Sequence, residues 1–397
     1  MTPVSRRLSP VSLRALLALA VLCVMVSTTG WTAVRPPAAE GARAAAVAAW
    51  MTGSAGLRQL PAPTSPPAAI SHFFASLTAA QRARLAERYP LVVGNLDGVS
   101  PTLRYRANRL ALAEQQTRAR RLAHSGELNF SGQRQASELA TRYASLLTPG
   151  RQILAFDPTG SGLVAEVFGD LSTARRVAVV VPGSDTDVLD FESANKPYEA
   201  PVGMGQALYE AERREAPDAH TAVIAWAGYT APVGLGLDAS TGTLAERGAP
   251  RLESLLASLP RRATVSLFCH SYGSVLCGVA APHLPHGRVR DLAVFGSPGM
   301  RADRVSDLRT TAHVWAARDS GDWISDVPYV EFAGLGHGAD PVSAAFGARV
   351  LSAAGADGHS GYFAPGSTSL ADFADIALGR YGSVVCRSGA SCTTGLR

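Results

Sequence analysis

The second half of the chain alternates short apolar runs with helical patterns, and this alternation constrains the fold more than any other feature. Residues 177–183 (VAVVVPG) form a continuous apolar run, which is typical of a strand buried on both faces. Similar runs occupy residues 221–228, 264–270, 291–297 and 312–317. Helical patterns occupy residues 203–213, 243–258, 273–282 and 369–379. The alternation predicts an α/β fold with a mostly parallel central sheet flanked by helices, preceded by a hairpin of QILAFD and GLVAEVFGD.

Composition excludes several classes of protein. The 397 residues are 47% hydrophobic and only 17% charged, which is enough for a full core and excludes global disorder. The net charge of +5 comes from arginine, because Lys196 is the only lysine. The arginines are scattered among acidic residues rather than clustered, so we expect no nucleic-acid partner.

The N-terminus carries an export pattern. Arg6, Arg7 and Arg14 precede a stretch free of charged residues that covers residues 15–34. Basic residues before such an apolar run are typical of a secretory signal peptide or an uncleaved membrane anchor. We therefore interpret residues 1–34 as one of these two, and we expect the remainder to be secreted or membrane-anchored, outside the cytoplasm.

The cysteines are compatible with export. Cys386 and Cys392 lie close together in a Ser/Gly-rich tail, residues 383–397, where a disulfide could close a short loop. Cys269 and Cys277 lie in apolar surroundings, and we expect them to be buried thiols.

Between the N-terminal segment and the predicted sheet lie two further regions. The first is rich in Ala and Pro and is interpreted as a linker. The second is helical: Thr78 and Gln81 form a capping-box signature, and apolar residues recur at helical spacing from about 101 to 121. We expect this region to pack beside the sheet as a candidate cap over the site. The predicted order is a signal or anchor at 1–34, the linker at 35–70, the helical region at 71–150, the α/β domain at 151–382 and the tail at 383–397.

The segment TVSLFCHSYGSVLCGVAA places a serine between a buried strand and a helix. Ser271 follows the strand directly, which is the position of the nucleophile in a nucleophile elbow. Gly273 provides the small residue that such a tight turn requires two positions later. Cys269 stands two positions earlier, where G-x-S-x-G has glycine, and this weakens the motif. The ordinary alternative is a serine that caps a helix.

A serine nucleophile needs a base, and the base needs an acid that orients it. In α/β-hydrolases the order along the chain is Ser, then Asp or Glu, then His. Asp319 and Asp322 follow the strand at 312–317, and we favour Asp322, which lies deeper in the loop. His359 falls between a predicted last strand at 348–354 and the final helix, so we favour it over His337 as the base.

Acyl transfer also needs donors for a developing oxyanion. The backbone N–H of Tyr272, directly after Ser271, is one candidate. The backbone N–H of Ser184, after the strand at 177–183, is the other. We expect no cofactor and no metal, because the chain has no Cys-x-x-Cys pair and Pro285 interrupts the single His-x-x-His.

With these motifs, the chain resembles the actinobacterial α/β-hydrolase family usually filed as a domain of unknown function, many members of which are exported. The resemblance runs from about residue 70 to 380, in the segments VVGNLDGVSPTLRYRANR, VAVVVPGSDT, WAGYTAP, CHSYGS, FGSPGM, ADPVSAAFGARV and GHSGYF. It implies an α/β-hydrolase fold and a triad of Ser271, Asp322 and His359. It does not imply a substrate.

Taken together, these features predict an extracytoplasmic serine hydrolase, most simply a carboxylic ester hydrolase. It would cleave a small-molecule or lipid-like ester, or an amide, through an acyl-enzyme. Two alternatives remain open at this point. One is a catalytically weak binding module that keeps the hydrolase fold, and the other is an acyltransferase with the same triad.

Overall fold

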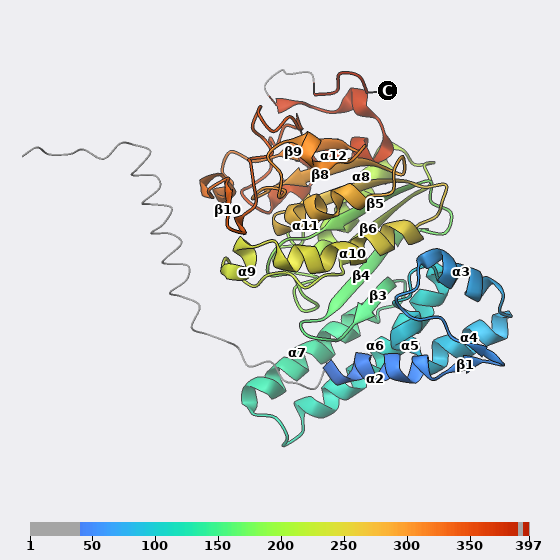
Figure 1. Ribbon diagram of the computed structural model, residues 1–397. Coiled ribbons are helices and arrows are strands. Elements are labelled where there is room, and N and C mark those ends of the chain that lie inside the picture. The colour runs from blue at the N-terminus through green and yellow to red at the C-terminus, as the bar shows by residue number, and fades with distance from the viewer. Residues whose placement is uncertain (1–39, 388–391, 397) are drawn as a thin grey trace, which may run out of the picture.

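A central sheet of eight strands organises the computed structural model, which describes residues 40–387 and 392–396. Its strands are β3 (Gln152–Asp157), β4 (Leu163–Gly169), β5 (Arg176–Val181), β6 (Thr221–Ala227), β7 (Thr264–His270), β8 (Val289–Phe295), β9 (His313–Ala317) and β12 (Arg349–Val350). The spatial order is β12-β9-β8-β7-β5-β6-β4-β3 (Figure 1). Strand β4 pairs antiparallel with β3 and with β6, and all other neighbours are parallel. The predicted mostly parallel sheet and its hairpin are therefore confirmed.

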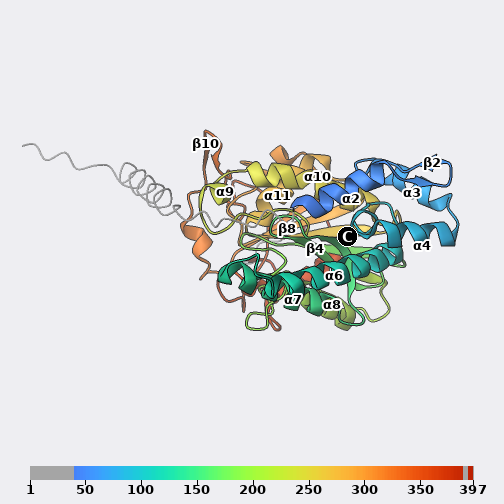
Figure 2. The ribbon, with the colours of Figure 1, turned by 90° about the horizontal axis from the view of Figure 1, so that it is seen from below.

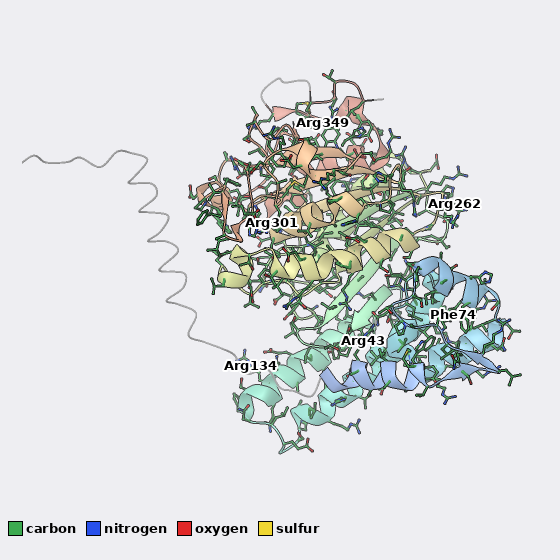
Figure 3. All side chains as sticks on the ribbon, viewed as in Figure 1. Arg43, Phe74, Arg134, Arg262, Arg301 and Arg349 are labelled. Carbon is green, nitrogen blue, oxygen red and sulfur yellow. A yellow bond between two sulfur atoms is a disulfide. The ribbon has the colours of Figure 1, made fainter. Side chains whose placement is uncertain are left out.

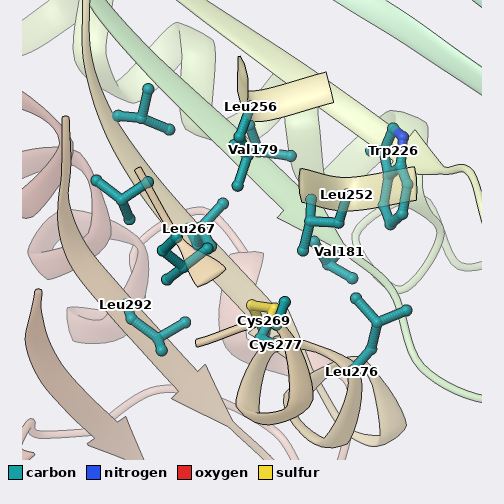
Figure 4. Close-up of a cluster of buried hydrophobic side chains, with 14 of the residues drawn as sticks. Val179, Val181, Trp226, Leu252, Leu256, Leu267, Cys269, Leu276, Cys277 and Leu292 are labelled. Atoms are coloured by element: carbon teal, nitrogen blue, oxygen red, sulfur yellow. A yellow bond between two sulfur atoms is a disulfide. The ribbon is translucent and has the colours of Figure 1, made fainter. Parts of the chain in front are cut away.

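Helices cover both faces of this sheet. One face carries α10 (Thr243–Ser258) and α11 (Tyr272–Ala280), and the other carries α8 (Pro201–Glu215) and α12 (Thr368–Leu378). Figure 2 shows α10 and α11 on the side of the sheet opposite α8. The side chains of β5 alternate accordingly. Val179 and Val181 pack with the first pair of helices (Figure 4), and Ala178 and Val180 pack with the second pair. Both faces of the strand are apolar because both are buried.

The helical region packs against the free edge of the sheet. It contains α4 (Ala79–Arg88), α5 (Pro90–Val93), α6 (Pro101–Ala123) and α7 (Phe130–Leu146), and the capping box of Thr78 and Gln81 is formed at the start of α4. Asn95, Arg104 and Asn108 donate side-chain hydrogen bonds of 2.7, 3.0 and 3.0 Å to backbone carbonyls of β3. These bonds satisfy an edge strand that would otherwise be open to pairing. The region thus lies beside the edge of the sheet (Figure 1), and no hydrogen bond within the described residues joins it to Ser271, Asp322 or His359.

The linker expected at 35–70 is wrong for the part that is described, residues 40–70. This part contains α2 (Glu40–Met51), the short strands β1 (Ser54–Ala55) and β2 (Arg58–Gln59), and the start of α3 (Pro67–Ala75). Trp50 is fully buried, and its indole donates to the Pro61 carbonyl at 2.7 Å. An alanine-rich segment has high helix propensity, and proline favours the first turn of a helix. The alanines and prolines therefore build helices that bury Trp50 and Ile70.

The remaining elements are short segments between the strands and helices described above. They are α9 (Leu237–Ser240), β10 (Glu331–Phe332), β11 (Leu335–Gly336) and the 3-10 helices at Ala281–His283, Val305–Leu308, Trp323–Asp326, Gly361–Phe363 and Tyr381–Ser383. The last strand, expected at 348–354, is shorter, because the chain turns after Val350 and Leu351 forms an antiparallel bridge with Cys386. Cys386 and Cys392, whose pairing the sequence left open, form a disulfide in the tail.

The predicted signal peptide or anchor at 1–34 lies outside the described residues. Within the described part of the chain, no helix is both long enough and apolar enough to span a bilayer.

Candidate active site

Ser271 occupies a tight turn between β7 and α11. Its backbone has φ 50° and ψ −126°, a conformation that a residue other than glycine rarely adopts. Such a turn lifts the side chain off the end of the strand and places it ahead of the helix N-terminus. The predicted strand–turn–helix context of Ser271 is therefore present, and the serine is not an ordinary helix cap.

The turn is possible because two neighbouring residues lack a side chain. A Cβ atom at Gly273 would lie 2.6 Å from the carbonyl oxygens of Val181 and Pro182, so only glycine fits there. A Cβ atom at Gly183 would lie 2.6 Å from the Cβ of Ser271. The loop after β5 therefore passes directly against the serine.

Cys269 and Cys277 correct an expectation from the sequence. Both side chains are fully buried, as expected, but they form a disulfide rather than two thiols (Figure 4). The end of β7 and the second turn of α11 bring their Cα atoms within 6.6 Å, which is inside bonding range. Cys269 thus replaces the first glycine of G-x-S-x-G with a covalent link across the turn that carries Ser271.

The structure brings Ser271, His359 and Asp322 into one hydrogen-bonded chain. The Ser271 hydroxyl lies 2.9 Å from Nε2 of His359, and Nδ1 of His359 lies 2.8 Å from Oδ1 of Asp322. The tautomer with hydrogen on Nδ1 fits both contacts: Nδ1–H donates to the carboxylate, and Nε2 accepts from the hydroxyl. The three residues come from segments that follow β7, β9 and β12, which are parallel strands with their carboxyl ends at the same edge of the sheet.

The two alternatives left open by the sequence lie elsewhere. Oδ2 of Asp319 accepts from the backbone N–H groups of Gly321 (2.8 Å) and Gly358 (3.3 Å), and so supports the loop that precedes His359. His337 is buried, and its Nε2 lies 2.7 Å from the carbonyl oxygen of Ala239. Burial lowers the pKa of His337. Neither side chain is bonded to Ser271 or His359 among the described residues.

Comparison with known proteins agrees with this architecture. Residues 157–332 match the sequence profile of a family described as alpha/beta hydrolase. The chain has the α/β-hydrolase fold. The match confirms the resemblance noted from the motifs, and it includes Ser271 and Asp322 but ends before His359.

The α/β-hydrolase domain has relatives in mycobacteria. An uncharacterized protein of Mycobacterium tuberculosis is 26% identical over 378 residues, which cover 81% of this chain and 57% of that protein. An uncharacterized protein of Mycobacterium bovis is 32% identical over 170 residues, which cover 40% of this chain and 62% of that protein. The chain thus spans a little over half the length of the first relative.

Similar solved structures include two hydrolases. One is a serine hydrolase without a lid from Xanthomonas campestris, with 17% identity, a TM-score of 0.29, and coverage of 44% of this chain and 74% of that one. The other is 2,6-dihydroxy-pseudo-oxynicotine hydrolase, with 16% identity, a TM-score of 0.28, and coverage of 62% and 72%.

Asp322 of the hydrolase domain is buried yet remains ionised. Burial opposes the charge, but hydrogen bonds from His359, from the Tyr362 phenol (2.6 Å) and from the Ile324 backbone (2.9 Å) outweigh it. The net effect holds the pKa of Asp322 below its ordinary value. A carboxylate that stays charged can orient the imidazole and stabilise it when it becomes protonated.

His270 has a role that sequence reasoning missed. Its Nε2 lies 2.7 Å from the backbone carbonyl oxygen of His359. Burial, and then the proximity of His359, lower the pKa of His270 to about 3. The ring is therefore neutral at physiological pH, and its N–H donates to the carbonyl. His270 positions the backbone that carries His359.

Tyr362 was also missed, although it lies three residues after His359. No local pattern marks a tyrosine that bonds a carboxylate 40 residues away. The sequence does contain one signal for His270, since this residue directly precedes Ser271 at the end of a buried strand.

The two predicted oxyanion donors are the backbone N–H groups of Tyr272 and Ser184. Tyr272 is the first residue of α11, so its N–H has no partner four residues earlier in the helix. Its buried side chain donates to the carbonyl of Thr241 at 2.7 Å and so holds the residue in place. Ser184 follows Gly183, which lies against Ser271, and Tyr229 donates to the neighbouring Pro182 carbonyl at 2.7 Å.

The described residues contain no group of three or more His, Cys, Asp or Glu side chains arranged to hold a metal ion.

Proposed function

We propose that this protein is an extracytoplasmic serine hydrolase that cleaves a carboxylic ester or amide through an acyl-enzyme on Ser271. The observation that carries the proposal is the hydrogen-bonded chain from Ser271 through His359 to the ionised Asp322. The strained backbone of Ser271 supports it, because such strain is characteristic of a nucleophile elbow.

In the proposed mechanism, the Ser271 oxygen attacks the substrate carbonyl while Nε2 of His359 takes the hydroxyl proton. The N–H groups of Tyr272 and Ser184 donate to the oxyanion. When the carbon–oxygen or carbon–nitrogen bond breaks, His359 returns the proton to the leaving group. A water molecule, deprotonated by His359, then attacks the acyl-enzyme and releases the carboxylic acid. Asp322 keeps the hydrogen on Nδ1 throughout.

Two features support a location outside the cytoplasm. Disulfides persist in oxidising compartments, and the domain contains two of them, Cys269–Cys277 and Cys386–Cys392. The sequence of residues 1–34 has the pattern of an export signal or anchor. In this proposal the substrate is a small-molecule or lipid-like ester, and the membrane is a partner if the N-terminal segment is retained.

Labelling with a fluorophosphonate probe tests the proposal, because such probes react readily only with an activated serine. The wild-type chain should be labelled, and the Ser271→Ala and His359→Ala variants should not. Removal of a triad serine lowers turnover by on the order of a million-fold. His337→Gln is the control, since among the described residues this histidine makes no hydrogen bond to Ser271 or His359, and a glutamine amide can still donate to the carbonyl of Ala239. Labelling of the Ser271→Ala variant at the wild-type rate would refute the proposal.

A further inference from the structure

Exposed apolar side chains gather in two segments of the hydrolase domain. In the part of the chain that the structure describes, twelve large hydrophobic side chains are exposed, and half of them fall in two short stretches. These six are Val233, Leu235, Leu237, Trp323, Val330 and Phe332, and we call them the apolar rim. The two stretches follow β6 and β9, whose carboxyl ends lie on the same side of the sheet as Ser271. Figure 1 shows α9 and β10, which belong to them, at the same end of the molecule.

The first stretch borders the predicted oxyanion loop. The backbone N–H of Asp185 donates to the carbonyl of Pro232 at 2.8 Å, and the N–H of Gly234 donates to the Asp185 carboxylate at 2.6 Å. The oxyanion loop thus contacts this stretch through Asp185 and lies against Ser271 at Gly183. Val233 and Leu235 are 70% and 50% exposed there.

The second stretch borders the base. The ring centroids of Trp323 and His359 are 4.5 Å apart, yet Trp323 is 41% exposed. Tyr329 anchors the following turn, since its hydroxyl lies 3.1 Å from the carbonyl oxygens of Ser297 and Ile324. Phe332, at the tip of the β10–β11 hairpin, is 82% exposed.

Polar contacts hold the two stretches together. Thr241 forms an antiparallel bridge with Leu335, and His337 bonds the carbonyl of Ala239. Arg301, which lies beside the hairpin (Figure 3), pairs with Glu331 at 3.0 Å. These contacts hold the two loops in place while the six side chains of the apolar rim stay exposed to solvent. Clustered apolar surface next to a site is typical of ligand binding.

We propose that the apolar rim binds the aliphatic acyl chain of the substrate, so that the protein prefers esters of medium-chain fatty acids over acetate. This inference rests on the proposed function, with Ser271 as the nucleophile. One stretch of the rim borders the oxyanion loop and the other borders the base, so an acyl chain that leaves the reacting carbonyl toward either loop meets apolar side chains. None of the six side chains carries a charge, which matches a hydrocarbon chain. Full burial of a methylene group favours binding about fourfold, and partial burial less.

The test is the specificity constant of the full chain for p-nitrophenyl acetate, butyrate, hexanoate and octanoate, each kept below its micelle-forming concentration. We expect kcat/KM to rise by about tenfold or more from acetate to octanoate. Phe332→Ser and Leu235→Ser should each lower the octanoate-to-acetate ratio, by about threefold. Phe130→Ser is the matched control, because Phe130 is also 82% exposed but belongs to α7 in the helical region. It should leave the ratio unchanged.

Several outcomes would overturn the inference. One is a flat dependence on acyl length, and another is an equal fall of the ratio in the Phe130→Ser control. If the rim variants instead weaken sedimentation with phosphatidylcholine vesicles and the ratio stays constant, the rim docks on a lipid surface. If they change only the molar mass measured by light scattering, the rim joins two copies of the chain. Failure of the proposed function itself looks different: no ester is hydrolysed, and the fluorophosphonate probe does not label Ser271.

Discussion

The phenol of Tyr362 donates a hydrogen bond of 2.6 Å to Oδ2 of Asp322, the carboxylate oxygen that His359 does not contact. Tyr362 is fully buried, and its own oxygen accepts from the backbone N–H of Asp319 at 3.0 Å. Burial, together with the charge of Asp322, raises the pKa of Tyr362 well above its ordinary value, so the phenol stays protonated and donates. Tyr362 is thus a positioning residue for the proposed acid.

Tyr362→Phe should lower kcat by roughly tenfold to a hundredfold, with a smaller effect on KM, because a hydrogen bond to a charged group is lost. Without this donor the Asp322 carboxylate keeps more of its negative charge for the imidazole of His359 and favours the protonated imidazole, which cannot accept the Ser271 proton. The acid side of the pH–activity profile should therefore move to higher pH. Tyr381→Phe is the matched control, since Tyr381 donates at 2.9 Å to the buried Asp291 away from the site. A variant of Tyr362 with an unshifted profile would contradict the assigned role.

Asp322→Asn and Asp319→Asn separate the two candidate acids. Asp322→Asn removes the acceptor that holds His359 in its tautomer, and kcat should fall roughly ten-thousand-fold. Asp319→Asn disturbs only the backbone contacts to Gly321 and Gly358, so the loss should be far smaller. Steady-state kinetics on a common ester substrate measures both. Equal losses would mean that Asp319 takes part in the chemistry.

The two disulfides should differ in importance although they close loops of similar length. Sequence separations of 8 and 6 residues give each about 2.5 kcal/mol in a chain-entropy argument. Cys269 and Cys277 are fully buried and enclose Ser271, whereas Cys386 is half-buried in the tail. Replacing Cys269 and Cys277 with alanine should lower both the melting temperature and the rate of fluorophosphonate labelling. The same change at Cys386 and Cys392 should lower the melting temperature less and leave the labelling rate unchanged.

We expect the buried Glu212 to make the stability of the protein depend on pH, separately from the titration of the candidate active site. It is buried on α8, and burial, partly offset by the charge of Arg176, raises its pKa to about 8. The folded state therefore holds this proton more tightly than the unfolded state, where a glutamate titrates near about 4.3. The contribution of Glu212 to stability is fully present below about pH 4 and is lost as pH rises through about 8.

The Glu212→Gln variant should not lose stability in this way as the pH rises, because glutamine does not titrate. Its free energy of unfolding in urea should exceed that of the wild type by on the order of 1 kcal/mol or more above about pH 8, with no such gain below about pH 4. Glu210→Gln, at an exposed position of the same helix, is the control and should show no pH-dependent gain. A gain of equal size at both pH values would show that the effect does not come from titration of Glu212.

The sequence by itself determined the features that depend on neighbouring residues. Apolar runs alternating with helical patterns predicted the parallel sheet, because strands buried on both faces need continuous apolar side chains. The strand–turn–helix around Ser271 and the order Ser, Asp, His along the chain were visible for the same reason. The Ala/Pro-rich stretch before residue 70 was misread, because its composition suits a linker as well as the helices that bury Trp50.

Only the tertiary structure decided which distant groups meet. Spacing in the sequence did not reveal that Cys269 and Cys277 lie within bonding range, since that distance depends on how α11 leaves the turn. The order of the segments favoured Asp322 over Asp319 and His359 over His337, but it did not show that these side chains contact one another and Ser271, because those contacts join loops after different strands. The hydrogen bond from His270 to the His359 carbonyl spans 89 residues. Such bonds depend on angstrom-scale distances that arise only once the sheet brings the carboxyl ends of its strands together.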